Sequence, residues 1–324
     1  MSRIRDLISR NCKDCNSFID IFAWTWVVTS EILELYDNFI MNDFLYSNEV
    51  IYKWFFMKGK YSKSKLEKIK KEYLEIDSSK IHDNYVSLNY WGKYFSKNDS
   101  KKIWFIREDI EEKYIGEKIS EKEYYILLSS LLYSFDKCSN TVGHYEAYIR
   151  KDNISDQFKF DLIEPYEWDK NIKIYREDSN QLVRKIKWDI AFIDPPYNSR
   201  QYSRFYHVME TIIKRDKPEL LGVAMKPKEE NMSDYCRNKA AEAFADLINN
   251  LDVKYIAVTY NNTYNSKSSS SKNKITLEEI KEILERRWKT DIYEHKYNAF
   301  NAGKTELDDH KEYLFLTKVT NGLH

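Results

Sequence analysis

Glycine, proline and cysteine are all scarce in this chain of 324 residues, which contains 7 glycines, 5 prolines and 4 cysteines. So little glycine and proline excludes collagen-like and low-complexity disordered proteins. Lysine plus arginine equals aspartate plus glutamate at 52 each, so no overall basic field exists and any affinity for nucleic acid must come from local patches. What remains is a chain long enough to bury a large core, as one elaborated domain or as two lobes.

The cysteines and the lack of long apolar runs limit the cellular setting. Cys12-x-x-Cys15 is half of a zinc-binding pattern, but no second close pair or nearby histidine completes it, so we expect no metal site. Free thiols of this kind are typical of a reducing cytoplasm. The chain opens with no signal peptide and has no apolar run that would span a membrane. We therefore expect a cytoplasmic protein without a membrane segment.

The most informative segment is Asp194-Pro195-Pro196-Tyr197, which directly follows an apolar strand expected at residues 188–193. Proline cannot continue a central strand, and ligands of open α/β sheets bind where such strands end. Asp194 and the carbonyl of Pro195 can accept both hydrogens of an exocyclic amino group, and Tyr197 offers a face for stacking a planar base. The alternative is a strand followed by a purely structural proline turn.

This motif, extended by Asn198-Ser199-Arg200-Gln201-Tyr202, resembles the catalytic motif of the S-adenosylmethionine-dependent DNA adenine-N6 methyltransferases. The similarity is greatest to the Dam-like methylases of restriction-modification systems. Other segments that resemble this family are residues 136–148, 207–212 and 260–315. The resemblance is clear from about residue 120 to 320, patchier from 1 to 45, and weak from 46 to 100.

The resemblance implies an α/β fold, a Rossmann-like methyltransferase sheet with helices on both faces, formed by residues 1–45 and 171–324. Residues 46–170 would form an inserted, mostly helical target-recognition lobe. We expect strands at residues 18–22, 38–41, 172–175, 188–193, 255–260, 291–297 and 312–318, the last two as an antiparallel hairpin at one edge. Lysines crowd residues 58–71 of the lobe, where they either contact phosphates or are simply solvated.

The family resemblance also nominates residues that would bind S-adenosylmethionine. In the family, the first strand runs into a glycine-containing loop that holds the methionine end of the cofactor, and the matching stretch here is residues 18–26. An acidic residue at the end of the second strand is placed to bind ribose hydroxyls. Asp178 matches a position that often hydrogen-bonds the cofactor's adenine. The candidate cofactor-binding residues are Asp20, Phe22, Ala23, Asp43 and Asp178.

One departure from the family lies in that loop, where Trp24 and Trp26 stand at both expected glycine positions. Glycine belongs there because the backbone approaches the ligand and adopts positive φ. A residue with Cβ in this conformation costs about 1–2 kcal/mol. An indole would also occupy the cofactor's volume, and a loss of about 4 kcal/mol lowers affinity a thousandfold. The alternative is that residues 18–28 form one long buried strand with core tryptophans.

The reaction implied by the resemblance is methyl transfer from S-adenosylmethionine to an adenine that is flipped out of double-stranded DNA. Catalysis would rest on positioning and electrostatics, with no metal. The candidate DNA-binding residues are Arg200, Gln201, Tyr202 and Lys304. We expect a monomer that acts alongside a cognate restriction endonuclease.

Two hypotheses for function remain open at this point. One is an active, site-specific adenine-N6 methyltransferase. The other is a catalytically inactive, DNA-binding pseudo-methyltransferase, or a knock-out variant, in which Trp24 and Trp26 block the cofactor. A methylase acting on RNA is disfavoured, because residues 44–170 contain no recognisable RNA-binding module.

Overall fold

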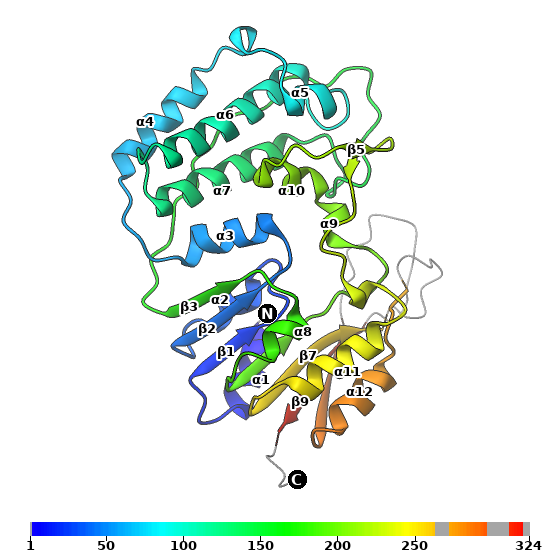
Figure 1. Cartoon of the computed structure of the whole chain (residues 1–324). Coiled ribbons are helices and arrows are strands. Elements are labelled where there is room, and N and C mark those ends of the chain that lie inside the picture. Colours follow the sequence, from blue (N-terminus) through cyan, green and yellow to red (C-terminus); the bar gives the residue numbers. More distant parts are fainter. Residues whose placement is uncertain (1, 263–271, 297–310, 320–324) are drawn as a thin grey trace. The chain divides into compact units, whose positions relative to one another are not determined.

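The computed structural model describes residues 2–262, 272–296 and 311–319 (Figure 1). These residues divide into two compact units. The first unit comprises Met1–Phe44, Asp169–Gln201 and Met232–His324, and the second comprises Leu45–Trp168 and Tyr202–Asn231.

A seven-stranded sheet of order β3-β2-β1-β4-β7-β9-β8 forms the centre of the first unit (Figure 1). Its strands are β1 (Ser17–Asp20), β2 (Asn38–Asn42), β3 (Asn171–Tyr175), β4 (Ile190–Ile193), β7 (Tyr255–Asn261), β8 (Thr290–Lys296) and β9 (Lys311–Lys318). The first five strands in this order pair in parallel, whereas β9 is antiparallel to both β7 and β8. This arrangement confirms the expected Rossmann-like sheet and the antiparallel pair at its edge.

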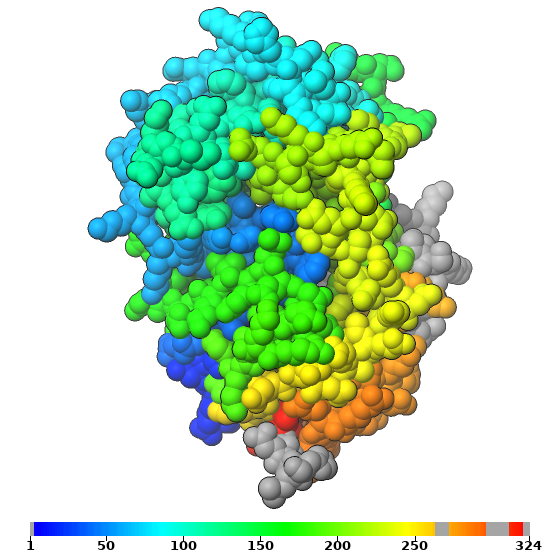
Figure 2. Space-filling view, viewed as in Figure 1, coloured from blue at the N-terminus to red at the C-terminus, as the bar shows by residue number. Residues whose placement is uncertain are grey.

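Helices cover both faces of this sheet, as expected. Alternate strand residues such as Ile19 and Ala191 share one core with α8 (Ser179–Val183), α11 (Ala240–Asn250) and α12 (Leu277–Glu285). Figure 2 shows α11 in yellow and α12 in orange on the viewed face of this unit. Side chains alternate along a strand, so Phe18 points to the other face. There its ring stacks on Tyr36, which follows α2 (Val27–Ile32), at 6.2 Å.

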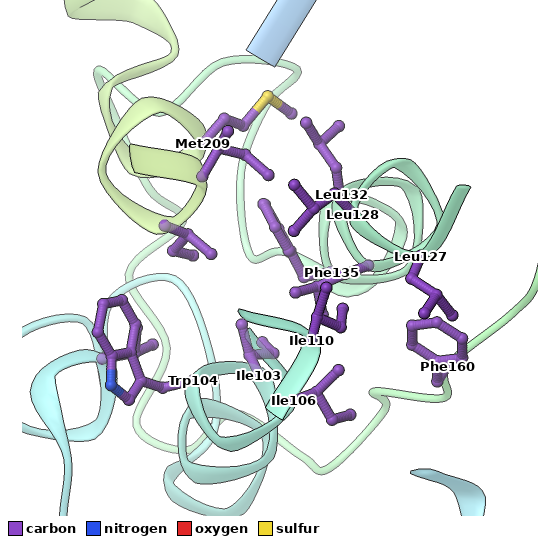
Figure 3. Packing of buried hydrophobic residues seen from close by; sticks show 14 of the residues in the cluster. Ile103, Trp104, Ile106, Ile110, Leu127, Leu128, Leu132, Phe135, Phe160 and Met209 are labelled. Atoms are coloured by element: carbon purple, nitrogen blue, oxygen red, sulfur yellow. The ribbon is translucent and has the colours of Figure 1, made fainter. Parts of the chain in front are cut away.

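The second unit is mostly helical and has a core of its own. Its helices are α3 (Tyr46–Phe56), α4 (Lys63–Leu74), α5 (Tyr85–Asn89), α6 (Lys97–Ile115), α7 (Glu121–Cys138), α9 (Tyr202–Phe205) and α10 (His207–Lys214). Figure 3 shows Ile103 and Ile110 of α6 with Leu128 and Phe135 of α7 in this core. A two-stranded hairpin, β5 (Leu220–Leu221) with β6 (Lys226–Pro227), completes the unit. None of the helices in the described ranges is long and apolar enough to cross a bilayer.

Residues 202–231 pack with the second unit, although the sequence predicted them to be part of the catalytic domain, within residues 171–324. Met209 of α10 lies in the helical core (Figure 3). The Glu210 carboxylate accepts hydrogen bonds from the backbone N–H groups of Tyr46 (3.0 Å) and Ser47 (2.9 Å), at the start of α3. The buried Arg107 donates to the Ile213 carbonyl near the end of α10 (2.9 Å). These partners are distant in sequence. The local patterns of strands and helices therefore could not reveal that the chain enters the second unit a second time, at residues 202–231.

The lysine-rich stretch of the lobe is partly neutralised by acids of the same unit. Lys63 pairs with Glu164 at 2.6 Å, and Lys65 pairs with the buried Glu123 at 2.9 Å. Lys70 lies 3.4 Å from an Asp161 carboxylate oxygen. This pairing favours the alternative in which the lysines are part of a solvated surface and do not contact phosphates.

Candidate active site

The Asp194 carboxylate follows β4, whose four residues are all buried. The register pairs Ile193 with Val258, so Thr259 of β7 lies beside Asp194. The Thr259 hydroxyl donates to Asp194 Oδ1 at 2.9 Å, and the Tyr197 hydroxyl donates to the same oxygen. Within the part of the chain that the structure describes, Asp194 Oδ2 accepts no hydrogen bond. This oxygen is therefore the acceptor that the site offers to a ligand.

Tyr197 is anchored by residues from outside the motif. Its ring meets the ring of Tyr260 edge-on, with centroids 5.0 Å apart. Its carbonyl accepts a hydrogen bond from the Lys274 backbone N–H at 2.8 Å. Pro195 is buried and Pro196 is partly buried. The motif is thus a fixed corner at the carboxyl end of β4, and stacking of a base on Tyr197 stays a prediction.

A second carboxylate, Asp20 at the end of β1, is almost fully buried. Thr29 Oγ1 donates to its Oδ2 at 2.8 Å, while its Oδ1 has no hydrogen-bond partner among the described residues. Burial raises the pKa of Asp20 to about 7; the Thr29 hydrogen bond opposes this rise, and the charges of Asp194 and Asp43 add to it. Three carboxylates thus converge where β1, β2 and β4 end. Such a site suits a positively charged ligand that donates hydrogen bonds.

Asp20→Asn should stabilise the fold at high pH. The folded-state pKa of about 7 lies above the ordinary value of 3.8, so stability falls as the pH rises from about 4 to about 7. Asparagine still accepts from Thr29 but cannot ionise. We expect a gain of about 2–4 kcal/mol in the free energy of unfolding at pH 8, shrinking below about 1 kcal/mol at pH 4. Urea unfolding of both chains at pH 8 and pH 4 measures this gain. The same difference in the free energy of unfolding at both pH values would contradict the assigned pKa of Asp20. The exposed Asp291→Asn is the matched control.

Trp24 and Trp26 both adopt the left-handed backbone conformation, with φ of 28° and 52°. β1 ends at Asp20, and Trp24 is 40% exposed. The alternative of one buried strand over residues 18–28 is therefore wrong, because the chain turns out of the sheet after Asp20. The Asp43 carboxylate accepts a hydrogen bond from the Trp24 backbone N–H at 3.1 Å and so fixes the loop. Two tryptophans thus occupy conformations that glycine adopts without strain.

Asn42, which the sequence analysis did not nominate, holds the neighbouring loops together. Its side chain is buried at the end of β2. Nδ2 donates to the carbonyls of Ile21 (3.2 Å) and Glu177 (3.1 Å), and Oδ1 accepts from the Glu177 N–H (3.0 Å). One amide therefore joins the chain after β1 to the chain after β3. The only sequence signal was an amide that ends an apolar strand.

The other cofactor candidates all lie in the first unit. Phe22 meets the ring of Tyr235 edge-on at 5.0 Å. Ala23 is buried, and its N–H donates to the Asn42 carbonyl at 2.9 Å. Asp178 caps α8, because its Oδ1 accepts from the Gln181 N–H at 3.0 Å. Asp178 therefore has a structural role, and its contact with adenine stays a prediction.

The four predicted DNA-binding residues are placed differently. Arg200 is exposed. Gln201 is buried, and its side-chain amide forms two hydrogen bonds with the backbone of Ser233, at 2.9 and 2.8 Å. This burial argues against the predicted contact of Gln201 with DNA. Tyr202 begins α9 in the second unit, and Lys304 lies outside the described residues.

Comparison with known proteins identifies the family of this chain. Residues 1–262 match the family described as D12 class N6 adenine-specific DNA methyltransferase. The type II methyltransferase M.NlaIII of Neisseria lactamica is 31% identical over 94% of this chain and 91% of its own length. The modification methylase StsI of Streptococcus sanguinis is 34% identical over 76% of this chain, and M.FokI of Planomicrobium okeanokoites is 31% identical over 97%. The matched parts are only 40% and 50% of those two proteins. The chain belongs to the D12 class N6 adenine-specific DNA methyltransferase family.

Proposed function

We propose that this chain is built as a site-specific DNA adenine-N6 methyltransferase in which Asp194 and the Pro195 carbonyl accept the hydrogens of the target amino group. The observation that carries this proposal is the Asp194 carboxylate, whose Oδ1 is held by Thr259 and Tyr197 and whose Oδ2 accepts nothing from the described residues. Family membership supplies the reaction class.

The chemical task of this corner is to make adenine N6 a better nucleophile. The lone pair of N6 is delocalised into the ring, so the amino group is flat and weakly nucleophilic. Two acceptors that bind both amino hydrogens favour a more tetrahedral nitrogen, and the negative charge of Asp194 stabilises the positive charge that develops on it. The adenine must leave the duplex to reach this corner.

S-adenosylmethionine is the methyl donor that the site suits, supplying an activated methyl group on a sulfonium. The fit rests on charge: Asp20, Asp43 and Asp194 converge, and Asp20 Oδ1 lacks a partner among the described residues. We assign Asp43 to the ribose hydroxyls, and Phe22 and Ala23 to further contacts with the cofactor.

A second candidate function is a blocked methyltransferase that retains DNA binding. The positive φ of Trp24 and Trp26 favours it, because their loop keeps a backbone suited to glycine while carrying two indoles. Under this candidate, the catalytic corner at Asp194 is intact but no methyl donor reaches it.

The setting of the enzyme follows from relatives whose names mark them as modification methylases or type II methyltransferases. By analogy, we propose a monomer that protects double-stranded DNA from a cognate restriction endonuclease in the cytoplasm.

The deciding experiment is a methylation assay on double-stranded DNA of mixed sequence, with radiolabelled methyl donor and detection of N6-methyladenine. It compares the unmodified chain with the double variant Trp24→Gly, Trp26→Gly. N6-methyladenine from both supports the active enzyme, and product from the variant alone supports the blocked enzyme. DNA binding without product from either chain would overturn the proposed catalytic function.

The methylation rate of an active chain should rise with pH through about 6 and stay level above it. Burial raises the pKa of Asp194 to about 6, although hydrogen bonds from Tyr197 and Thr259 oppose the rise. The ionised Asp194 carboxylate can only accept hydrogen bonds, whereas its protonated form carries an O–H donor that would face the adenine amino group, another donor. Protonation of Asp194 below pH 6 therefore removes activity. Single-turnover rates from pH 5 to 9, at saturating donor and DNA, measure the profile. A rate that falls as the pH rises would contradict the assigned role.

A further inference from the structure

Thr259 lies outside every motif that identified the site, yet its side chain touches the Asp194 carboxylate. The residue is 3% exposed and is held within β7, which pairs with β4 on one side and β9 on the other. Its hydroxyl donates to Asp194 Oδ1 at 2.9 Å. A central strand is among the most rigid supports that the fold offers, so this hydroxyl is a fixed reference point for the carboxylate.

The second donor to the same oxygen, Tyr197, differs in its support. Tyr197 belongs to the irregular segment after β4 and is expected to stack on the flipped base. Its ring therefore takes part in the predicted contact with the base, whereas Thr259 acts on the carboxylate alone. Of the two donors, Thr259 is the one held within the sheet, and its hydrogen bond would decide which carboxylate oxygen faces the substrate.

Other charged groups near this pair act on the same carboxylate. Glu312 of β9 raises the pKa of Asp194 through its charge, while the hydrogen bonds from Thr259 and Tyr197 lower it. Asp194 in turn raises the pKa of Asp20. Thr259 and Glu312 also line a cavity of about 310 Å³. The other charged or titratable groups on the cavity wall are Arg3, Asp6, Arg10, Tyr293, Glu294, His295 and Tyr313.

We propose that Thr259 is a positioning residue for methyl transfer: its hydroxyl fixes Asp194 Oδ1 and thereby presents Oδ2 to the adenine amino group. This inference rests on the proposed function, since it names a residue that orients the same acceptor. It adds a contact that the sequence motif does not contain.

The first test measures Asp194 directly and requires no activity. Aspartate labelled with 13C at the carboxyl carbon is titrated by NMR in the unmodified chain, with Asp194→Asn to assign the resonance. Thr259→Val keeps the side-chain shape but removes the donor, and should raise the pKa of Asp194 by about one. Thr259→Ser keeps the donor and should leave it within about 0.3. Glu312→Gln removes a negative charge and should lower it.

The second test is kinetic and uses a chain that methylates DNA, either unmodified or with Trp24→Gly and Trp26→Gly. Thr259→Val should lower kcat by about 10–100-fold with the KM for DNA within about twofold, and Thr259→Ser should recover most of the loss. A structural role alone would lower stability in both variants without separating kcat from KM.

The two tests fail separately. If no parent chain methylates DNA, the proposed function fails while the NMR titration still decides whether Thr259 sets the ionisation of Asp194. If Thr259→Val and Thr259→Ser give the same Asp194 pKa, or the same kcat in an active parent, the positioning role is overturned. Unfolding curves of each variant establish that the measured chain is folded.

Discussion

Replacing Trp24 and Trp26 together by glycine should tighten the binding of S-adenosylmethionine by about a thousandfold or more. Both residues hold positive φ, at a cost of about 1–2 kcal/mol each, and both carry an indole in the loop that follows β1. This backbone strain exists with or without the cofactor, so the gain in affinity comes from removing the indoles and is expected to be at least about 4 kcal/mol. Calorimetric titration of the cofactor into the two chains measures the difference.

Alanine at the same two positions separates strain from bulk. Trp24→Ala with Trp26→Ala removes the indoles but keeps Cβ at positive φ, so it should recover most of the affinity without the gain in stability that glycine brings. Trp288→Gly is a matched control, since Trp288 is exposed in the same unit and lies outside the loop. Tight binding by the unmodified chain would show that the tryptophans fit a rearranged loop, and the blocked-enzyme hypothesis would then be abandoned.

The sheet was predictable because β1, β2, β4 and β7 are short apolar runs with a polar residue at or directly after the carboxyl end, whereas the edge strand β3 is less buried. Such runs bury both faces and differ from the amphipathic helices between them. The end of β1 was less predictable. The apolar pattern continues past Asp20 to Phe22, which predicted a longer strand. The chain leaves the sheet after Asp20, because the residues that follow form the loop in which the Trp24 N–H donates to Asp43.

The contacts that orient the site could not be predicted from the sequence, because they join segments that are far apart in the chain. Thr259 meets Asp194 through the register of β4 with β7, and Asn42 meets Glu177 through the register of β2 with β3. No local pattern records which strand lies beside which. Gln201 shows the same limit: its position in the motif predicted a contact with DNA, and nothing local indicated that its amide is buried against Ser233.

Asp194→Asn should abolish methylation, with a loss of at least about a thousandfold in kcat, whereas cofactor binding should weaken far less because Asp20 and Asp43 remain. The size of the loss follows from the two donors that already hold Oδ1. Thr259 and Tyr197 will orient the asparagine carbonyl toward themselves, so the amide NH2 takes the place of Oδ2. A donor then faces the adenine amino group, which is itself a donor.

The measurement is single-turnover methylation in whichever parent chain binds the cofactor, together with calorimetry of the cofactor. Asp189→Asn is the matched control: Asp189 precedes β4 at the opposite end of the strand, where its carboxylate binds the Ser17 hydroxyl at 2.8 Å and Lys254 at 2.8 Å. That variant should lose some stability but keep its rate within about twofold. If Asp194→Asn retained a tenth or more of the parental rate, the acceptor of the amino hydrogens would have to be sought elsewhere. If Asp194→Asn and Asp189→Asn lost activity equally, the rate would depend on the total negative charge at the ends of β4 and not on the position of the Asp194 carboxylate.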